Sequence, residues 1–290
     1  MGKFGRSWAL AKSSWSVLRA DKELLLLPVI SGITTLVVMA SFALPIFLTT
    51  STDNSSATTL ADGTTTGSTF HIAPVGYVLI FVAYIALAYV TIFFNTALIS
   101  AADERMRGGN PTLGSALRGA TSRAGAILPW AIVSATVSMV LRSLEQRAGI
   151  LGRLVIGLVG MAWSLVTFLV LPILVLEHVG VGTAIKRSAE LFKRTWGENV
   201  IANAAMGFIG LLAVLIPIPL VIAAAATGFA PAIVSAIVLA VVWFLAVSIV
   251  LSALGVVYQV ALYRYATDGV APAAFATVDL GGAFRPKGRK

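Results

Sequence analysis

The sequence predicts an all-α, polytopic membrane protein: a helical bundle with six transmembrane helices and three interfacial amphipathic helices in a pseudo-threefold repeat. The first observation is composition, since 58% of the 290 residues are hydrophobic and only 11% are charged, whereas soluble domains carry about 25% charged residues. The second is a set of six long apolar segments, and the third is a short pattern that recurs before three pairs of them. We expect residues 1–290 to form a single membrane domain.

Each predicted span is long enough to cross the hydrocarbon core of a bilayer, which takes roughly 20 mostly apolar residues in a helix. Helices are expected because lipid offers no hydrogen-bond partner to an open backbone. The third span is the least apolar at its end, where Arg142, Glu145 and Arg147 lie. The six segments are about 24–48, 74–101, 126–147, 151–176, 200–224 and 232–263.

The distribution of basic residues predicts the orientation, because short cytoplasmic loops are enriched in Lys and Arg. Of the 21 Lys and Arg residues, 18 lie in four stretches between or beyond the spans, and loop 49–73 has none. This loop is rich in Ser, Thr and Gly, so we expect it to be flexible and outside the cell. The chain is therefore predicted to be a multi-pass protein of the cell membrane with cytoplasmic N and C termini. The four basic stretches are 1–23, 102–125, 177–199 and 264–290.

An internal repeat organises the predicted spans. An apolar–Gly–x–small–apolar pattern begins at Phe4, Leu113 and Val181, and each copy precedes a pair of spans. Recurrence at matching places in the topology indicates three similar units, each an interfacial helix followed by a helical hairpin. The predicted units are about 1–102, 103–178 and 179–268, and a basic C-terminal tail, 269–290, follows them.

The first of the three interfacial helices is predicted over residues 4–18. Its aromatic residues, Trp8 and Trp15 among them, recur at helical spacing on one face, with Lys12 and Arg19 near the margins. Such a helix is expected to lie in the headgroup region, with its rings toward the lipid and its cations reaching phosphates. Anionic lipids on the cytoplasmic side are therefore the expected partners.

Motifs that would indicate catalysis are missing from the sequence. It has no zinc-protease, phosphate-binding, hydrolase-elbow or dinucleotide-binding motif, and no Cys to form disulfides or thiolate metal sites. We therefore predict no catalytic residue, no metal site and no cofactor. The net charge of +9 does not indicate nucleic acid, because no basic soluble domain is present to bind it.

Polar residues recur along one face of three predicted spans. One interpretation is close helix packing, in which small residues let backbones approach and amides hydrogen-bond across helices. The other is a polar pathway or ligand cavity on which the three faces converge. Packing is the favoured interpretation, and both stay open. The stripes are Tyr84, Thr91 and Asn95 in the second span, Ser164 and Thr167 in the fourth, and Ser248, Ser252 and Gln259 in the sixth.

A charged cluster lies where the third and fourth predicted spans meet. It consists of Arg142, Glu145, Arg147 and Arg153. The side chains can snorkel to phosphates of the outer leaflet, which is the favoured interpretation. Alternatively, the surplus positive charge forms an outward-facing site for an anion or a lipid headgroup, because charges at a bilayer boundary are costly unless paired, hydrated or bound to a counter-ion.

Three runs carry a family resemblance: AWSLVTF at 162–168, AIKRSAELF at 184–192 and ALYRYATDG at 261–269. They resemble a family of uncharacterised prokaryotic multi-pass membrane proteins, classified as a domain of unknown function. The run at 184–192 is also similar to interfacial helices in the membrane part of certain glycerophosphodiester phosphodiesterases. No soluble phosphodiesterase domain is present, so the resemblance implies a membrane location and no catalytic residues.

These observations favour a non-enzymatic membrane scaffold, or a module that binds a partner or lipid. The alternative is a transporter or channel for a small anionic or lipid-like solute, with a pathway among the second, fourth and sixth spans. A broken helix would favour transport, and Pro217 and Pro219 in the fifth span are the best candidates for a break. A second copy of the chain or another membrane protein remains open as a partner.

Overall fold

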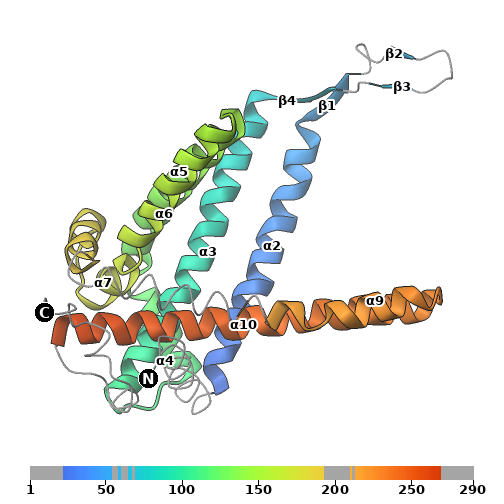
Figure 1. The fold of residues 1–290 in the computed structure, drawn as a ribbon. Coiled ribbons are helices and arrows are strands. Elements are labelled where there is room, and N and C mark those ends of the chain that lie inside the picture. The colour runs from blue at the N-terminus through green and yellow to red at the C-terminus, as the bar shows by residue number, and fades with distance from the viewer. Residues whose placement is uncertain are drawn as a thin grey trace, which may run out of the picture.

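A computed structural model describes most of the chain, and the described residues are predominantly helical (Figure 1). Within them, five helices are long and apolar enough to cross a membrane. This confirms the prediction of an α-helical protein with several apolar spans. The described residues are 22–53, 58–59, 65–66, 69–192, 210 and 213–268. The five helices are Glu23–Leu48, Pro74–Met106, Ala124–Arg147, Ile150–Leu176 and Ala230–Asp268.

These helices coincide with the first four predicted spans and the sixth. The predicted fifth span, 200–224, lies mostly outside the described residues. Its described end contains a turn at 216–217 followed by helix α9, Ile218–Ala226. The turn includes Pro217, consistent with the helix-breaking effect of a residue that lacks an N–H. The predicted in-plane helix 4–18 and the tail 269–290 lie outside the described residues.

The first hairpin consists of helices α2 and α3, which pack against each other. A 3-10 turn, η1 (Lys22–Leu25), leads into α2 (Leu26–Leu48), and α3 spans Pro74–Met106. Between the two helices, strand β1 (Thr50–Asp53) pairs antiparallel with β4 (Thr69–Ile72).

The described parts of loop 49–73 therefore form a narrow ribbon at the far end of the hairpin (Figure 1). Further along it, β2 (Thr58–Thr59) pairs with β3 (Thr65–Thr66). The sequence indicated a flexible loop, and the ribbon is a difference from that prediction. The β-branched Thr residues explain it, because they favour extended backbone.

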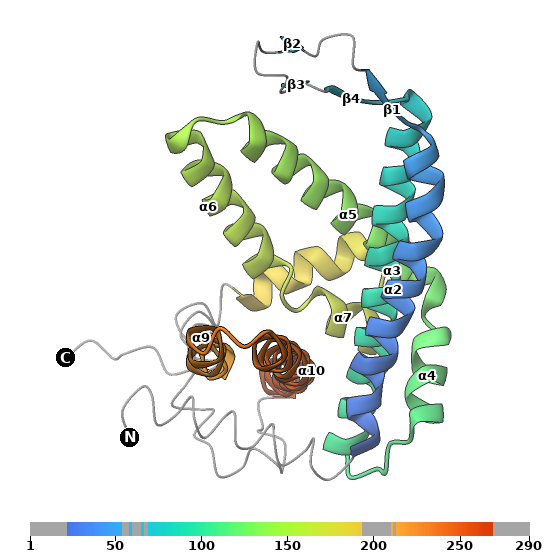
Figure 2. The same ribbon diagram turned by 90° about the vertical axis from the view of Figure 1, so that its right-hand side faces the viewer.

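Helix α4 (Leu113–Thr121) lies alongside the C-terminal part of α3 (Figure 2). It begins with a capping box, in which Thr112 and Ser115 each bond the other's backbone N–H, and such caps satisfy donors that a helix start leaves free. Small residues allow the close approach. A Cβ added at Gly119 would lie 2.6 Å from Ser100 Oγ.

The second hairpin consists of α5 (Ala124–Arg147) and α6 (Ile150–Val166), and it leans away from the α2–α3 pair (Figure 2). Trp130 and Trp163 stack between its helices, with ring centroids 6.3 Å apart. The predicted fourth span is interrupted, since α6 ends at Val166, residues 167–169 form a turn and α7 covers Val170–Leu176. A further helix occupies 181–192.

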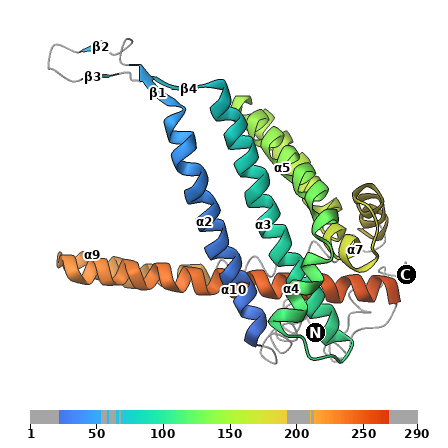
Figure 3. The same cartoon turned by 180° about the vertical axis from the view of Figure 1, so that it is seen from behind.

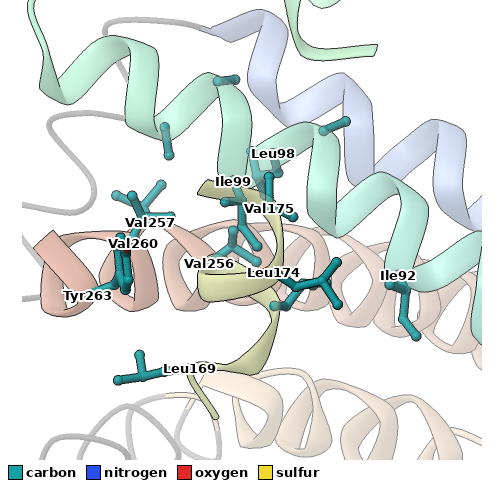
Figure 4. Close-up of a cluster of buried hydrophobic side chains, with 14 of the residues drawn as sticks. Ile92, Leu98, Ile99, Leu169, Leu174, Val175, Val256, Val257, Val260 and Tyr263 are labelled. Carbon is teal, nitrogen blue, oxygen red and sulfur yellow. The ribbon is translucent and has the colours of Figure 1, made fainter. Parts of the chain in front are cut away.

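The longest helix, α10 (Ala230–Asp268), runs across the foot of α2 and α3 (Figures 1 and 3). Helix α9 lies beside its first part. The second part of α10 is buried against α3 and α7, and there the main hydrophobic core forms (Figure 4). Core side chains from these three helices include Leu98, Ile99, Leu174, Val175, Val256, Val257 and Val260.

The first part of α10 has large apolar side chains exposed around the helix, for example Val238, Val242, Phe244 and Leu245. Helix α2 exposes Ile33, Leu36 and Val37 in the same way. Contiguous apolar surface of this extent is not stable in water and indicates contact with a membrane or another protein. The apolar length of the spans makes lipid the natural surrounding.

Candidate binding pocket and the polar contacts of α10

An ion pair joins the C-terminal end of α10 to α3. Arg264 Nε donates to Asp103 Oδ1 at 2.7 Å, and Arg264 Nη2 lies 2.6 Å from the same oxygen. The side chain of Asp103 is only 9% exposed and that of Arg264 only 19%. Arg107 Nε is 3.0 Å from the other Asp103 oxygen, and Arg264 Nη1 is 3.3 Å from Asp268. The charge of Asp103 is tolerated at this depth because it is paired.

Glu177 joins three separate helical segments. Its Oε1 atom accepts a hydrogen bond from the hydroxyl of Tyr263 in α10 at 2.9 Å and another from Arg187 Nε at 2.7 Å. The hydrogen bond to Glu177 raises the pKa of Arg187, against a smaller opposing effect of burial, so the guanidinium stays charged. Glu177 follows directly after α7 and thus links this helix to α10 and to helix 181–192.

The interruption after α6 frees a backbone carbonyl that α10 satisfies. Pro172 has no N–H, so the carbonyl four residues earlier, that of Phe168, loses its usual helical donor. The side-chain amide of Gln259 in α10 donates to this carbonyl instead. Gln259 therefore works as a tertiary cap on a broken helix, and the packing interpretation of this stripe residue is the one that the contact supports.

Ser188 satisfies two more backbone groups of the same turn. Its hydroxyl accepts from the N–H of Leu169 at 3.2 Å and donates to the carbonyl of Val166 at 2.5 Å. Ser188 is fully buried. Its hydroxyl pairs the N–H of Leu169 and the carbonyl of Val166, two backbone groups that are costly to bury without a partner. The turn between α6 and α7 is thus closed from both sides, by α10 and by helix 181–192.

A pocket of about 240 Å³ lies between α2, α3 and α10. Polar side chains from all three helices line it: Ser31 of α2, Thr91 and Asn95 of α3, and Ser248 and Ser252 of α10. The pocket arises where α10 crosses the α2–α3 pair, because small side chains at the crossing leave space between the backbones. It brings together polar stripes that the sequence predicted on the second and sixth spans.

The polar groups of the pocket are largely unpaired. The hydroxyl of Thr91 donates to the carbonyl of Leu87 in its own helix at 3.0 Å. Asn95, Ser31, Ser248 and Ser252 have no hydrogen-bond partner among the described residues. Ser31 and Asn95 are half-buried, and Ser248 and Ser252 are exposed, so these four side chains are available to a ligand.

The remaining stripe residues lie elsewhere. Tyr84 is half-buried in α3 and does not line the pocket. Ser164 and Thr167 donate to carbonyls of their own helix, those of Gly160 and Trp163. The stripe of the fourth span therefore does not join the other two in this pocket.

The charged cluster occupies the tip of the α5–α6 hairpin. Arg142, Glu145, Arg147 and Arg153 are all exposed. Among the described residues none of them forms an ion pair, and Arg153 Nε donates to the carbonyl of Ala148 at 3.2 Å. The geometry is compatible with snorkelling and with anion binding alike, so the anion site remains a prediction.

Several residues that fix the site were not singled out in the sequence. The pair Asp103–Arg264 joins positions 161 residues apart, and Ser31 and Ser188 are single hydroxyls in unremarkable contexts. A signal existed for Asp103 and Glu177, because an acidic residue at the end of an apolar span requires a partner. The identity of that partner could not be read from one sequence.

The described residues form an α-helical protein with five helices long and apolar enough to cross a membrane, and polar side chains tie the last of these helices to the others. In the described residues no group of His, Asp or Glu is arranged to hold a metal ion. The chain belongs to a family of unknown function, DUF6159, which matches residues 74–273. No curated protein matches the chain. The comparisons thus agree with the resemblance to an uncharacterised family and give no link to glycerophosphodiester phosphodiesterases.

Proposed function

We propose that this protein is a non-enzymatic, lipid-binding scaffold of the cell membrane. The observation that carries the proposal is the pocket between α2, α3 and α10, where four unpaired polar side chains meet beside apolar surface that lipid would cover. Polar groups at such a place are stabilised by a ligand that supplies hydrogen bonds.

The size of the pocket favours a lipid over a free solute. Sites that enclose a small molecule usually measure about 300–1,000 Å³, and this pocket measures about 240 Å³. It holds the polar part of a larger molecule. The rest of that molecule would lie against the exposed apolar side chains of α2 and α10, as the acyl chains of a lipid do.

A transporter or channel for a small anionic or lipid-like solute is the second candidate. The observation in its favour is that the polar stripes of α3 and α10 share the pocket. Broken helices in transporters offer free backbone groups to ions. Here Gln259 and Ser188 occupy those groups in the break after α6, so the scaffold is the better supported function.

The proposal keeps six spans in three repeat units, although α10 lies across α2 and α3 and not alongside them (Figure 1). It also includes anionic lipids as partners on the cytoplasmic side and no nucleic acid. A second copy or another membrane protein remains a candidate partner. Support for the repeat comes from α4 and helix 181–192. Their matching positions, Ala116 with Ala184 and Ala120 with Ser188, are all fully buried, as expected for two copies of one packing unit.

The orientation is tested by labelling single cysteines, since the chain has no Cys. A cysteine at Ser56 in the loop 49–73 is expected to react with a membrane-impermeant maleimide in intact cells. One at Ser122, which is exposed after α4, is expected to react only after permeabilisation. The opposite pattern would reverse the topology that the basic residues predict.

Lipid binding is tested by native mass spectrometry of the protein extracted from membranes. The parent is expected to retain lipid, and the triple variant Asn95→Leu, Ser248→Ala and Ser252→Ala to retain at least a few-fold less, because each lost hydrogen bond is worth about 0.5–1.5 kcal/mol. Ser164→Ala, outside the pocket, is the control. Equal retention by the triple variant would contradict the proposal, and solute flux in liposomes that the triple variant abolishes would favour the transporter.

A further inference from the structure

The pocket contains no charge to match a charged ligand. None of the residues that line it is acidic or basic. Beyond the pocket, toward the C-terminal end of α3, the next charged residue of this helix is Asp103, which is paired with Arg264. Asn95 precedes Asp103 by eight residues, which corresponds to about 12 Å along a helix that rises 1.5 Å per residue.

Depth therefore argues against a charged headgroup in the pocket. Half of the hydrocarbon core measures about 15 Å. With Asp103 at the edge of the core, as the basic stretch 102–125 predicts, Asn95 is placed about 12 Å inside it along α3. Among the described residues that line the pocket, a phosphate would find no cation to pair with, and unpaired charge inside the hydrocarbon core is costly.

The hydrogen-bonding groups of the pocket argue against a bare acyl chain. The amide of Asn95 offers two donors and one acceptor, and the hydroxyls of Ser31, Ser248 and Ser252 each offer a donor and an acceptor. An acyl chain would leave all of them unpaired. A hydroxyl together with ester carbonyls provides both kinds of partner.

We infer that the pocket binds the glycerol-ester part of an uncharged, diacylglycerol-class lipid, an inference that rests on the proposed lipid-binding function. Without a charged headgroup, such a lipid can place its hydroxyl and ester carbonyls below the level of Asp103. Its chains lie along the exposed apolar side chains of α2, such as Ile33 and Leu36, and of α10, such as Leu245. The polar part enters between Asn95 and Ser252.

The inference is tested on the full-length protein in phosphatidylcholine nanodiscs. Three photoactivatable probes with the same acyl chains are compared: diacylglycerol, phosphatidylglycerol and phosphatidylcholine. Cross-linked peptides are identified by mass spectrometry. The diacylglycerol probe is expected to label peptides of α3 and α10 that border the pocket, and unlabelled diacylglycerol to compete at least several-fold better than either phospholipid.

Two variants and a matched control locate the binding. Asn95→Leu and Ser252→Ala are each expected to lower diacylglycerol labelling about 3- to 10-fold, as for a lost hydrogen bond. Ser164→Ala lies outside the pocket, and its hydroxyl donates to the carbonyl of Gly160 in its own helix, so it should leave labelling nearly unchanged. Thermal unfolding of each variant checks that the fold is kept.

The possible outcomes distinguish the assignment of a diacylglycerol-class lipid from the more general proposal that the protein binds lipid. Pocket labelling by the phospholipid probes as strong as by diacylglycerol, and equally sensitive to Asn95→Leu, would overturn the diacylglycerol assignment and leave lipid binding intact. Absence of pocket labelling by all three probes would overturn the lipid-binding function as well.

Discussion

Replacing Arg264 by Gln is expected to destabilise the protein by about 3–5 kcal/mol, the usual result of removing one partner from a buried ion pair. The reason is Asp103, whose side chain is 9% exposed and which would lose its closest cation. The measurement is the free energy of unfolding in mixed micelles. Since this pair ties α10 to α3, the variant should also expose α10 to protease.

Arg107→Gln is the matched control, because Arg107 contacts the same carboxylate at 3.0 Å but is 64% exposed. Exposed ion pairs contribute about 0–1 kcal/mol, so this variant should be nearly as stable as the parent. Adding Asp103→Asn to Arg264→Gln should recover much of the loss, since the unpaired charge is removed. Equal losses for Arg264→Gln and Arg107→Gln would show that burial does not distinguish the two contacts.

Replacing Gln259 by Met is expected to cost about 1–3 kcal/mol, because the carbonyl of Phe168, which lies in a part-buried contact, loses its donor. Met keeps the length of the side chain and removes the amide that donates to the carbonyl of Phe168. The free energy of unfolding is again the measured quantity. Ser164→Ala serves as the control, because its hydroxyl is exposed and bonds only within its own helix.

The Gln259→Met measurement is repeated in a protein that also carries Pro172→Ala, to test whether the loss of stability arises at the carbonyl of Phe168. Alanine restores the N–H that a helix directs at the carbonyl four residues earlier, so Phe168 gains a donor of its own. The loss caused by Gln259→Met should then shrink by at least half, which a double-mutant cycle measures. An unchanged loss in both backgrounds would mean that Gln259 contributes by packing alone.

The sequence was sufficient to place the long apolar helices of this protein, but not the ribbon in loop 49–73 or the break after Val166. Apolar segments of more than 20 residues, bounded by charged or Gly- and Pro-containing stretches, predicted the helices at Leu26–Leu48, Pro74–Met106 and Ala124–Arg147 nearly to their ends. That success has a simple cause. A bilayer permits few backbone conformations and sets the helix length, so composition and run length carry most of the information.

The polar stripes show where prediction from the sequence ends. Helical spacing predicted which faces of α3 and α10 are polar, because periodicity is a local property. It could not tell that Asn95 and Ser252 face one pocket while Gln259, seven residues after Ser252 on the same face, caps the broken fourth span. It also gave no partner for Asp103 or Glu177.

The sequence alone therefore determined an α-helical membrane protein with polar faces on several helices. Only the tertiary structure decided which polar groups are paired and which are free, that is, the pairing of Arg264 with Asp103 and the open pocket at Asn95. The physical reason is that hydrogen bonds and ion pairs act over a few ångströms between residues up to 161 positions apart. Their partners are set by the angle at which α10 crosses the other helices, and that angle depends on packing along the whole contact.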